Sequence, residues 1–309
     1  MQRPIHSFLR ARTLPMALGC ALLVLAGCAG PQASGPVPPA ATQAAPWPER
    51  LHHLLPADVL LLGEQHDAPD HQRLQREAVL WLAARGQLAA LVMEMAESGH
   101  STQSLPQGAT EAQAQAALQW NDAAWPWKAY GPVVMAAVAA GVPVLGGNLP
   151  RAQMRAAMQE PAWDRHLPPA ALARQITALR DGHCGLLPEP QLAPMARIQI
   201  ARDASMARTA QQALRPGQTV LLVAGGGHVL RSLGVPTHWP ENLKSKVALA
   251  RVQHAQSAIE TEASQTTGTG AIAPADADAD VVIDTPALPP RDACAELREQ
   301  WRAAPRGQR

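Results

Sequence analysis

The sequence predicts an α/β fold, a single domain with a largely parallel central sheet flanked by helices. Apolar runs of strand length alternate with stretches of helical periodicity between residues 58 and 252, which is typical of strand–helix–strand units. The strand candidates are continuously apolar, as expected for parallel strands that are covered on both faces. Apolar residues make up 47% of the 309-residue chain, enough for one sizeable core.

Six apolar segments are the predicted strands. The first five lie within the region of alternation, and the sixth is expected to return to the sheet as an edge strand. They are residues 58–63, 88–95, 142–148, 219–228 with the exit loop included, 246–252 and 281–284.

The segments between the strands carry the periodicity of helices. In residues 69–85, Leu74, Ala78 and Leu82 recur at helical spacing, which places them on one face of a helix. Further helices are expected at residues 111–119, 130–140 and 149–214, the last interrupted near residue 164 and at residues 182–190. The larger side chains interpreted as core are those of Trp120, Trp125, Trp127, Met93, Met95 and Met206.

The N-terminal 27 residues are expected to be a lipoprotein signal peptide. Three arginines precede a short apolar segment that ends in LAGC at residues 25–28, and this order of basic and apolar regions is typical of a secretory signal. The ending resembles a bacterial lipobox, in which Cys28 carries the acyl chains, such as palmitate, and becomes the first mature residue. Ala29 follows without an acidic retention signal, so the outer membrane is the expected location. The alternative is an uncleaved anchor helix.

The rest of the chain divides by composition. Residues 28–46 are expected to be a disordered tether, residues 47–254 the α/β domain, and residues 255–280 a low-complexity segment. Residues 281–309 are expected to return to the domain as a strand and a short helix. Cys184 and Cys294 would lie in an oxidising compartment, where they are candidates for a disulfide. The formal net charge of +1 gives no general basic field for nucleic acid, so we expect no such partner.

Polar residues follow the apolar strands at the points where these strands end. Glu64 and His66 follow the first strand, Glu94 lies at the end of the second, and Asn148 and His228 close the third and fourth. Because ligands of open parallel sheets bind outside the carboxyl ends of the strands, we expect these side chains to share one rim. Both histidines also lie in a G-x-x-H tetrapeptide, GEQH and GGGH.

Two kinds of chemistry suit this rim. Glu64, His66, Glu94 and His228 could bind Zn²⁺ or Mn²⁺ at an open site and lower the pKa of a bound water. Alternatively, a carboxylate with a histidine partner could act as a general acid or base. The sequence alone does not decide between them.

Each rim residue also has a structural alternative. Glu94 could cap the following turn, Asn148 could be the N-cap of a helix that begins at Pro150, and His228 could be a satisfied loop residue. Asp70 is interpreted as an acid in the first turn of a helix, where it complements the helix dipole. Taken together, the paired tetrapeptides favour a site.

Seven segments resemble the ChaN-like haem-binding lipoproteins, in the same order along the chain. They are GEQHDAPDHQ, Glu94-Met95, WPWKAYGPV, GGNLPR, HCGLLPEP, QIARDASMA and AGGGHVLRSLGVP. That family is similar to the Tiki, TraB and erythromycin-esterase-like proteins, which share the paired G-x-x-H pattern. The resemblance spans residue 58 to about residue 252, with a weaker match at residues 292–298.

The resemblance implies an α/β fold, a lipid-anchored position in the cell envelope and a role in haem or iron uptake. It also implies the chemistry of the enzyme relatives, a metal or acid/base site carried here by Glu64, His66, Glu94 and His228. The Tiki relatives are metal-dependent proteases and the esterase relatives hydrolyse a lactone. Neither activity follows for this chain.

A haem site needs an axial ligand, an apolar slot and cations for the propionates. Tyr130, His71 and His100 are the candidate axial ligands, although Tyr130 has core packing as its alternative role. Arg151 and Arg231 are the candidate partners of propionates, because a guanidinium binds a carboxylate with two hydrogen bonds. Asn148 is the further candidate cofactor contact, whereas Arg202 and Asp203 are interpreted as a structural ion pair with neighbouring elements.

Three functions are consistent with these observations, and the resemblance favours the first. It is an outer-membrane lipoprotein that binds haem at the rim, with an outer-membrane haem or iron receptor and a second copy of the chain as candidate partners. The alternative is a metal-dependent hydrolase of the Tiki or erythromycin-esterase type that uses the paired G-x-x-H motifs with Zn²⁺ or Mn²⁺. The third is an envelope scaffold whose site has decayed, which the intact rim argues against.

Overall fold

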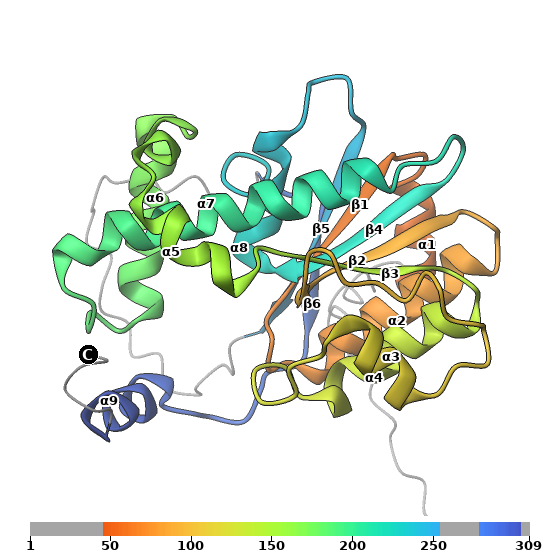
Figure 1. Cartoon of the computed structure of the whole chain (residues 1–309), viewed down its shortest axis with the longest axis horizontal. Helices are drawn as coiled ribbons and strands as arrows, with labels where there is room; N and C mark the ends of the chain where they lie inside the picture. Colours follow the sequence, from red (N-terminus) through yellow and green to blue (C-terminus); the bar gives the residue numbers. More distant parts are fainter. Residues whose placement is uncertain (1–45, 254–277, 304–309) are drawn as a thin grey trace, which may run out of the picture. The chain divides into compact units, whose positions relative to one another are not determined.

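A computed structural model of the chain describes residues 46–253 and 278–303. The strands in these residues form one parallel sheet in the order β3-β2-β4-β1-β5-β6 (Figure 1). The predicted α/β fold with a largely parallel sheet is therefore confirmed. The strands are β1 (Val59–Glu64), β2 (Leu88–Glu97), β3 (Val144–Asn148), β4 (Thr219–Gly225), β5 (Ser245–Val252) and β6 (Val281–Thr285).

The helices cover both faces of this sheet. Leu60 and Leu62 of β1 share a hydrophobic cluster with residues of α1, α2, α3 and α4, whereas Val59 and Leu61 share a second cluster with residues of α7. Since successive side chains of a strand point to opposite faces, the first group of helices packs on one face and α7 on the other. Apart from the single turn α8, the α-helices of the described residues are α1 (Trp47–His53), α2 (Pro69–Ala83), α3 (Glu111–Leu118), α4 (Trp127–Ala139), α5 (Arg151–Gln159), α6 (Pro169–Gly182), α7 (Glu189–Gln212) and α9 (Ala293–Ala303).

Three short elements were not predicted from the sequence. They are helix α1 and, beyond β4, the turn α8 (Gly226–Val229) and the 3₁₀ turn η2 (Val235–His238). Helix α1 is too short for its periodicity to be read, and a helix of this length needs tertiary support. Trp47 provides it, because its ring is buried and its Nε1–H donates to Leu74 O at 2.9 Å. A further 3₁₀ turn, η1 (Pro161–Arg165), lies at the predicted break near residue 164.

The tryptophan cluster was only partly assigned correctly. Trp127 is buried, as are Met93, Met95 and Met206, so the core interpretation is confirmed for these residues. Trp120 and Trp125 are partly buried and pack against the edge of the core. Helix α4 also begins at Trp127, three residues before the predicted start, because the Trp127 backbone N–H is held by Asp122 Oδ1 at 2.6 Å.

Strand β6 occupies the edge of the sheet, as predicted, and pairs with β5. The predicted low-complexity segment reaches too far, because Asp278 is buried and ion-paired to Arg174 at 2.8 Å, and Asp280 is ion-paired to Lys246 at 3.0 Å. Residues 254–277, the signal peptide with Cys28 and the tether up to residue 45 lie outside the described residues. Among the helices that are described, none has the length and apolar character needed to cross a membrane.

A disulfide joins Cys184 to Cys294, with their Cα atoms 5.6 Å apart. Cys184 lies in the turn between α6 and α7, and Cys294 is in the first turn of α9. No residue of α9 is buried, so the disulfide is a principal attachment of this helix to the rest of the domain.

Candidate functional site

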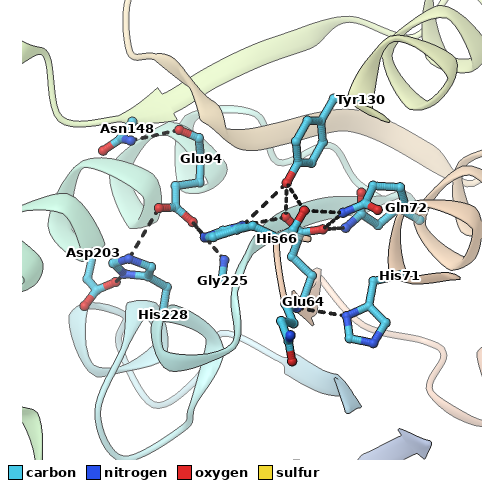
Figure 2. Close-up of polar contacts among 12 residues, drawn as sticks. Glu64, His66, His71, Gln72, Glu94, Tyr130, Asn148, Asp203, Gly225 and His228 are labelled. Atoms are coloured by element: carbon cyan, nitrogen blue, oxygen red, sulfur yellow. Dashed lines mark hydrogen bonds and ion pairs between the residues drawn. The ribbon is translucent and has the colours of Figure 1, made fainter. Parts of the chain in front are cut away.

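The carboxyl ends of β1, β2 and β4 bring four of the predicted side chains together (Figure 2). His66 Nδ1 lies 2.8 Å from Glu64 Oε1, and His66 Nε2 lies 4.0 Å from Glu94 Oε2. His228 Nε2 lies 3.5 Å from the other oxygen of Glu94. The convergence expected from the parallel topology is therefore present, and we call these four side chains the rim cluster.

Glu64 is buried, and its carboxylate accepts hydrogen bonds from four side chains. Its Oε1 accepts from the Tyr130 hydroxyl at 2.6 Å and faces His66 Nδ1, while its Oε2 accepts from the amides of Gln72 and Gln75. The two glutamines are three residues apart on α2 and so lie on one face of that helix. Uncharged donors and one imidazole thus satisfy this buried acid.

His228 of the rim cluster pairs with Asp203 of α7. Asp203 is buried, the His228 side chain is 14% exposed, and His228 Nδ1 lies 2.6 Å from Asp203 Oδ1. Burial alone would lower the pKa of His228, but the carboxylates of Asp203 and Glu94 outweigh it and raise the pKa to about 9. Burial raises the pKa of Asp203 to about 6, against the opposing effect of His228. The imidazole is therefore charged at neutral pH.

The interpretation of Arg202 and Asp203 as residues that form ion pairs with neighbouring elements is confirmed for Asp203, which pairs with His228, whereas Arg202 forms no ion pair within the described residues. Asp203 points toward His228 (Figure 2), and the guanidinium of Arg202 lies near Met154, with Nη2 3.9 Å from the sulfur. The two residues are adjacent on α7, so their side chains leave the helix in different directions.

Glu94 bridges the two histidines. Burial would raise its pKa, but the charges of His228 and His66 and the backbone N–H of Gly225 outweigh that effect, so the pKa is lowered. Gly225 N donates to Glu94 Oε2 at 2.8 Å, so Glu94 binds the neighbouring strand rather than capping its own turn. A Cβ at Gly225 would lie 3.0 Å from His66 Nε2, which explains why this position has no side chain.

His66 is the most exposed member of the rim cluster, with 40% of its side chain accessible. Burial lowers its pKa, but the hydrogen bond to Glu64 and the charge of Glu94 outweigh that effect, and the pKa is raised. The Trp125 ring meets the imidazole edge to face, with the ring centroids 4.8 Å apart. Among the four, His66 is therefore the side chain that a ligand meets first.

Asn148 joins the cluster from β3. Its Nδ2 donates to the backbone oxygen of Glu94 at 2.9 Å. The N-cap alternative was wrong, because Pro150 is the N-cap of α5 and no side chain caps that helix. Asp70 does lie in the first turn of α2, as interpreted, and is ion-paired to Arg73.

An apolar cavity of about 690 Å³ opens beside His66. Trp125, Tyr130 and three prolines form much of its wall, and three cations, Arg73, Arg76 and Lys128, also line it. Ligand pockets are commonly of this size and combine apolar walls with a few polar groups. Neither Arg76 nor Lys128 has an ion-pair partner within the described part of the chain.

Two of the predicted cofactor residues cannot reach this cavity. His71 is buried, with Nδ1 accepting from the Gln65 backbone N–H at 2.8 Å and Nε2 3.0 Å from Thr285 Oγ1. Both of its ring nitrogens are thus occupied. Arg231 lies in the connection between β4 and β5, does not line this cavity, and is ion-paired to Asp280. The predictions for His71 and Arg231 were therefore wrong.

Tyr130 and Arg151, two further predicted haem contacts, each line a cavity. Tyr130 lines the apolar cavity, but its hydroxyl donates to Glu64, and burial and this carboxylate raise its pKa well above the ordinary value. A phenolate ligand is thus disfavoured in this arrangement. Arg151 lines a second cavity, of about 520 Å³, together with Asn148 and His100.

The metal alternative receives no support from the geometry. Across residues 46–253 and 278–303, no group of three or more His, Cys, Asp or Glu side chains is placed to hold a metal ion. The donors of the rim cluster instead hold one another, as the distances above show.

Four residues of the site were missed at the sequence level. Gln72 and Gln75 carry a usable signal, since both follow GEQH on one helical face. Asp203 carries none, because its approach to His228 depends on how α7 packs. Trp125 was assigned to the core, although its ring faces His66.

Comparison with known proteins gives one family and one clear structural relative. Residues 50–238 match the family described as "Haem-binding uptake, Tiki superfamily, ChaN". A structure described as cofacial heme binding to ChaN of Campylobacter jejuni shares 23% sequence identity and a TM-score of 0.54. That match covers 66% of this chain and 85% of the other, and it shows the fold. No curated protein matches the chain.

Two more distant structures also match. The type III effector HopBA1 has 16% identity and a TM-score of 0.32, covering 63% of this chain and 77% of its own. A protein from Bacillus cereus has 12% identity and a TM-score of 0.37, covering 65% and 67%. At these TM-scores neither adds to the argument.

Proposed function

The chain belongs to the ChaN haem-binding uptake family of the Tiki superfamily, and from that premise we propose that it binds haem in the apolar cavity beside His66. The observation that carries this proposal is the composition of that cavity. It combines an aromatic and proline-rich wall, an accessible imidazole and three cations in one space of about 690 Å³.

The cavity meets the three requirements of a haem site. Trp125, Tyr130 and the prolines offer apolar surface to the porphyrin ring. Arg73, Arg76 and Lys128 offer positive charge to the propionates. Arg76 and Lys128 are exposed, so they reach the propionates without losing an existing ion pair. The structure of ChaN from Campylobacter jejuni is described as binding heme, which is consistent with this proposal.

His66 is the proposed axial ligand. It is one of two side chains of the cavity wall that commonly coordinate haem iron, the other being Tyr130. The Tyr130 hydroxyl is committed to Glu64, whereas the His66 ring is accessible and keeps Nε2 without a hydrogen bond in the described residues. The hydrogen bond from His66 Nδ1 to Glu64 orients the ring and favours a lone pair on Nε2, as second-sphere carboxylates do for metal-bound histidines.

Haemin titration followed by absorption spectroscopy tests this proposal. We expect a saturable Soret band for the parent protein and for Tyr130→Phe, and loss or a clear shift of that band for His66→Ala. Arg76→Glu is expected to weaken binding about tenfold, because it places a negative charge beside a propionate. Exchange of Arg155, an exposed residue of α5 outside this cavity, for Glu is the matched control. A normal band for His66→Ala and no band for Tyr130→Phe would assign the iron to the phenolate instead.

We also propose that the chain acts as a lipoprotein of the outer membrane in haem or iron uptake. Its support is the LAGC sequence before Ala29 and the description of the family. Metabolic labelling with a palmitate analogue, compared between the parent and Cys28→Ala, tests the anchor. An outer-membrane receptor and a second copy of the chain are the proposed partners, and chromatography with and without haemin tests the latter.

A further inference from the structure

The second cavity, of about 520 Å³, is not used by the haem proposal. It shares Ala124 and Trp125 with the apolar cavity but has a different lining. Its charged and polar residues are Glu94, Glu97, His100, Asn148, Arg151 and Arg202. Such a lining suits a small, strongly polar ligand rather than a porphyrin.

Two buried polar atoms belong to this lining and have no hydrogen-bond partner within the described residues. They are Asn148 Oδ1 and Arg202 Nε. Asn148 is 8% exposed, and the bond from its Nδ2 to Glu94 fixes the amide so that Oδ1 remains an unused acceptor. Leaving buried polar groups unpaired costs free energy. Both atoms are closed to solvent in this structure, so a ligand pairs with them once the side chains turn toward the cavity, and this pairing would recover that free energy.

The acids and the arginines that line the cavity also differ in whether they have partners. Glu94 is held by His228 and by the Gly225 N–H, and Glu97 Oε1 accepts from the Arg151 backbone N–H at 3.1 Å. By contrast, the guanidinium groups of Arg151 and Arg202 have no carboxylate partner among residues 46–253 and 278–303. The one hydrogen bond of the Arg202 side chain in these residues is to the Met154 sulfur, a weak acceptor, although its charge acts on the nearby Glu94 and Asp203 in the direction of lower pKa values. The acids therefore have partners at hydrogen-bond or ion-pair distance, whereas neither guanidinium group has a carboxylate at that distance in the described part of the chain.

We propose that this cavity binds a small α-hydroxy carboxylate, with acid groups on Arg202 and Arg151 and the hydroxyl donating to Asn148 Oδ1. Guanidinium groups bind carboxylates through paired hydrogen bonds, and an α-hydroxyl lies next to the carboxylate that Arg202 takes. A haem propionate is the other carboxylate that could enter past Trp125. It has no hydroxyl for Asn148, so the unused acceptor favours the free hydroxy acid.

Isothermal titration with citrate tests the proposal, with tricarballylate as the matched ligand that lacks only the hydroxyl. We expect saturable binding of one citrate, and at least about fivefold weaker binding of tricarballylate, the effect of one hydrogen bond to a buried acceptor. Arg202→Gln should weaken citrate binding about tenfold or more, and Arg202→Lys should lie between Gln and the parent. Arg208→Gln, an exposed position on the same helix, should leave binding unchanged.

Circular dichroism first establishes that each variant is folded. If Arg202→Gln does not fold, Arg151→Gln at the exposed end of the cavity takes its place with the same expectation. Absence of saturable citrate binding, equal affinity for the two ligands, or equal effects of Arg202→Gln and Arg208→Gln would overturn the proposal. So would exclusion of citrate by haemin but not by haemin dimethyl ester, which would assign the cavity to a propionate. A failure to bind citrate leaves the haem proposal unchanged, whereas the last outcome would keep haem binding and move one propionate into this cavity.

Discussion

The pair formed by His228 and the buried Asp203 predicts a specific dependence of stability on pH. The pKa of His228 is raised from 6.5 to about 9, a difference that corresponds to about 3 kcal/mol. Because the pKa is raised in the folded state, this stabilisation is fully present below pH 6.5 and is lost as the pH rises through about 9. We therefore expect the free energy of unfolding to fall by about 2 kcal/mol between about pH 7 and pH 9.5.

This window separates the two histidines of the rim cluster from the other perturbed groups of the site, since the pKa of His66 is also raised and acts in the same direction as that of His228. The raised pKa of Asp203, about 6, affects stability mainly below pH 7, and the lowered pKa of Glu94 acts lower still. The raised pKa of Tyr130 matters near and above pH 10, where the tyrosine of the unfolded chain ionises. The slope between these limits thus reports on the two imidazoles, and the part that depends on Asp203 reports on His228, its partner.

Urea unfolding at several pH values, with linear extrapolation to water, measures the effect. Asp203→Asn removes the main carboxylate partner, so the variant should be less stable at pH 7 and should lose most of the slope above it. Asp164→Asn is the matched control, since Asp164 pairs with Arg197 at the surface and does not titrate in this window. A parent protein whose stability is level from pH 7 to 9.5, or a slope that survives in Asp203→Asn, would refute the assignment of the charge to His228.

Two further changes test the fold that positions the rim cluster. Gly146→Ala should destabilise the protein by more than about 2 kcal/mol, because a Cβ there would lie 2.0 Å from the backbone oxygen of Glu97. Gly108→Ala, where the added atom meets nothing within 4 Å, is its control in thermal unfolding, and equal effects would contradict the close strand packing. Cys294→Ser should speed tryptic cleavage within α9. It should lower the free energy of unfolding by much less than the about 4–5 kcal/mol expected when a disulfide of this sequence separation restricts only the unfolded chain. The reason is that α9 buries no residue, so without the disulfide it gains freedom in the folded protein as well. A fall of about 4–5 kcal/mol in the free energy of unfolding would instead show that α9 is an integral part of the core.

The convergence at the rim was predictable because it follows from strand direction alone. Parallel strands end on the same edge of a sheet, and the register pairs Glu64 directly with Gly225, three residues before His228. Two acids and two imidazoles at the ends of β1, β2 and β4 therefore meet, because these three strands are neighbours in the sheet. The same argument placed Asn148 at the end of β3 beside Glu94.

The errors concern residues whose direction is set by helices or by distant segments. His71 and Gln72 are neighbours on α2, yet one turns to β6 and the other to Glu64, because adjacent helical residues point about 100° apart. The partner of His71, Thr285, lies more than 200 residues further along the chain. Arg231 likewise follows the GGGH motif but is drawn to Asp280, in a segment that composition alone suggested was unstructured.

Most polar atoms of the rim cluster already have hydrogen-bond or ion-pair partners within the protein. Ligands should therefore bind where polar groups lack such partners. Glu64 has four donors, Glu94 has two imidazoles and a backbone N–H, and His228 lies between two carboxylates. A ligand that displaced these contacts would have to repay each of them. The groups with unused capacity lie on either side of Trp125, namely the His66 ring with its nearby cations and the pair of guanidinium groups on Arg151 and Arg202. The binding chemistry of this chain therefore belongs to the two cavities, and the cluster serves to hold His66 and Asn148 in place between them.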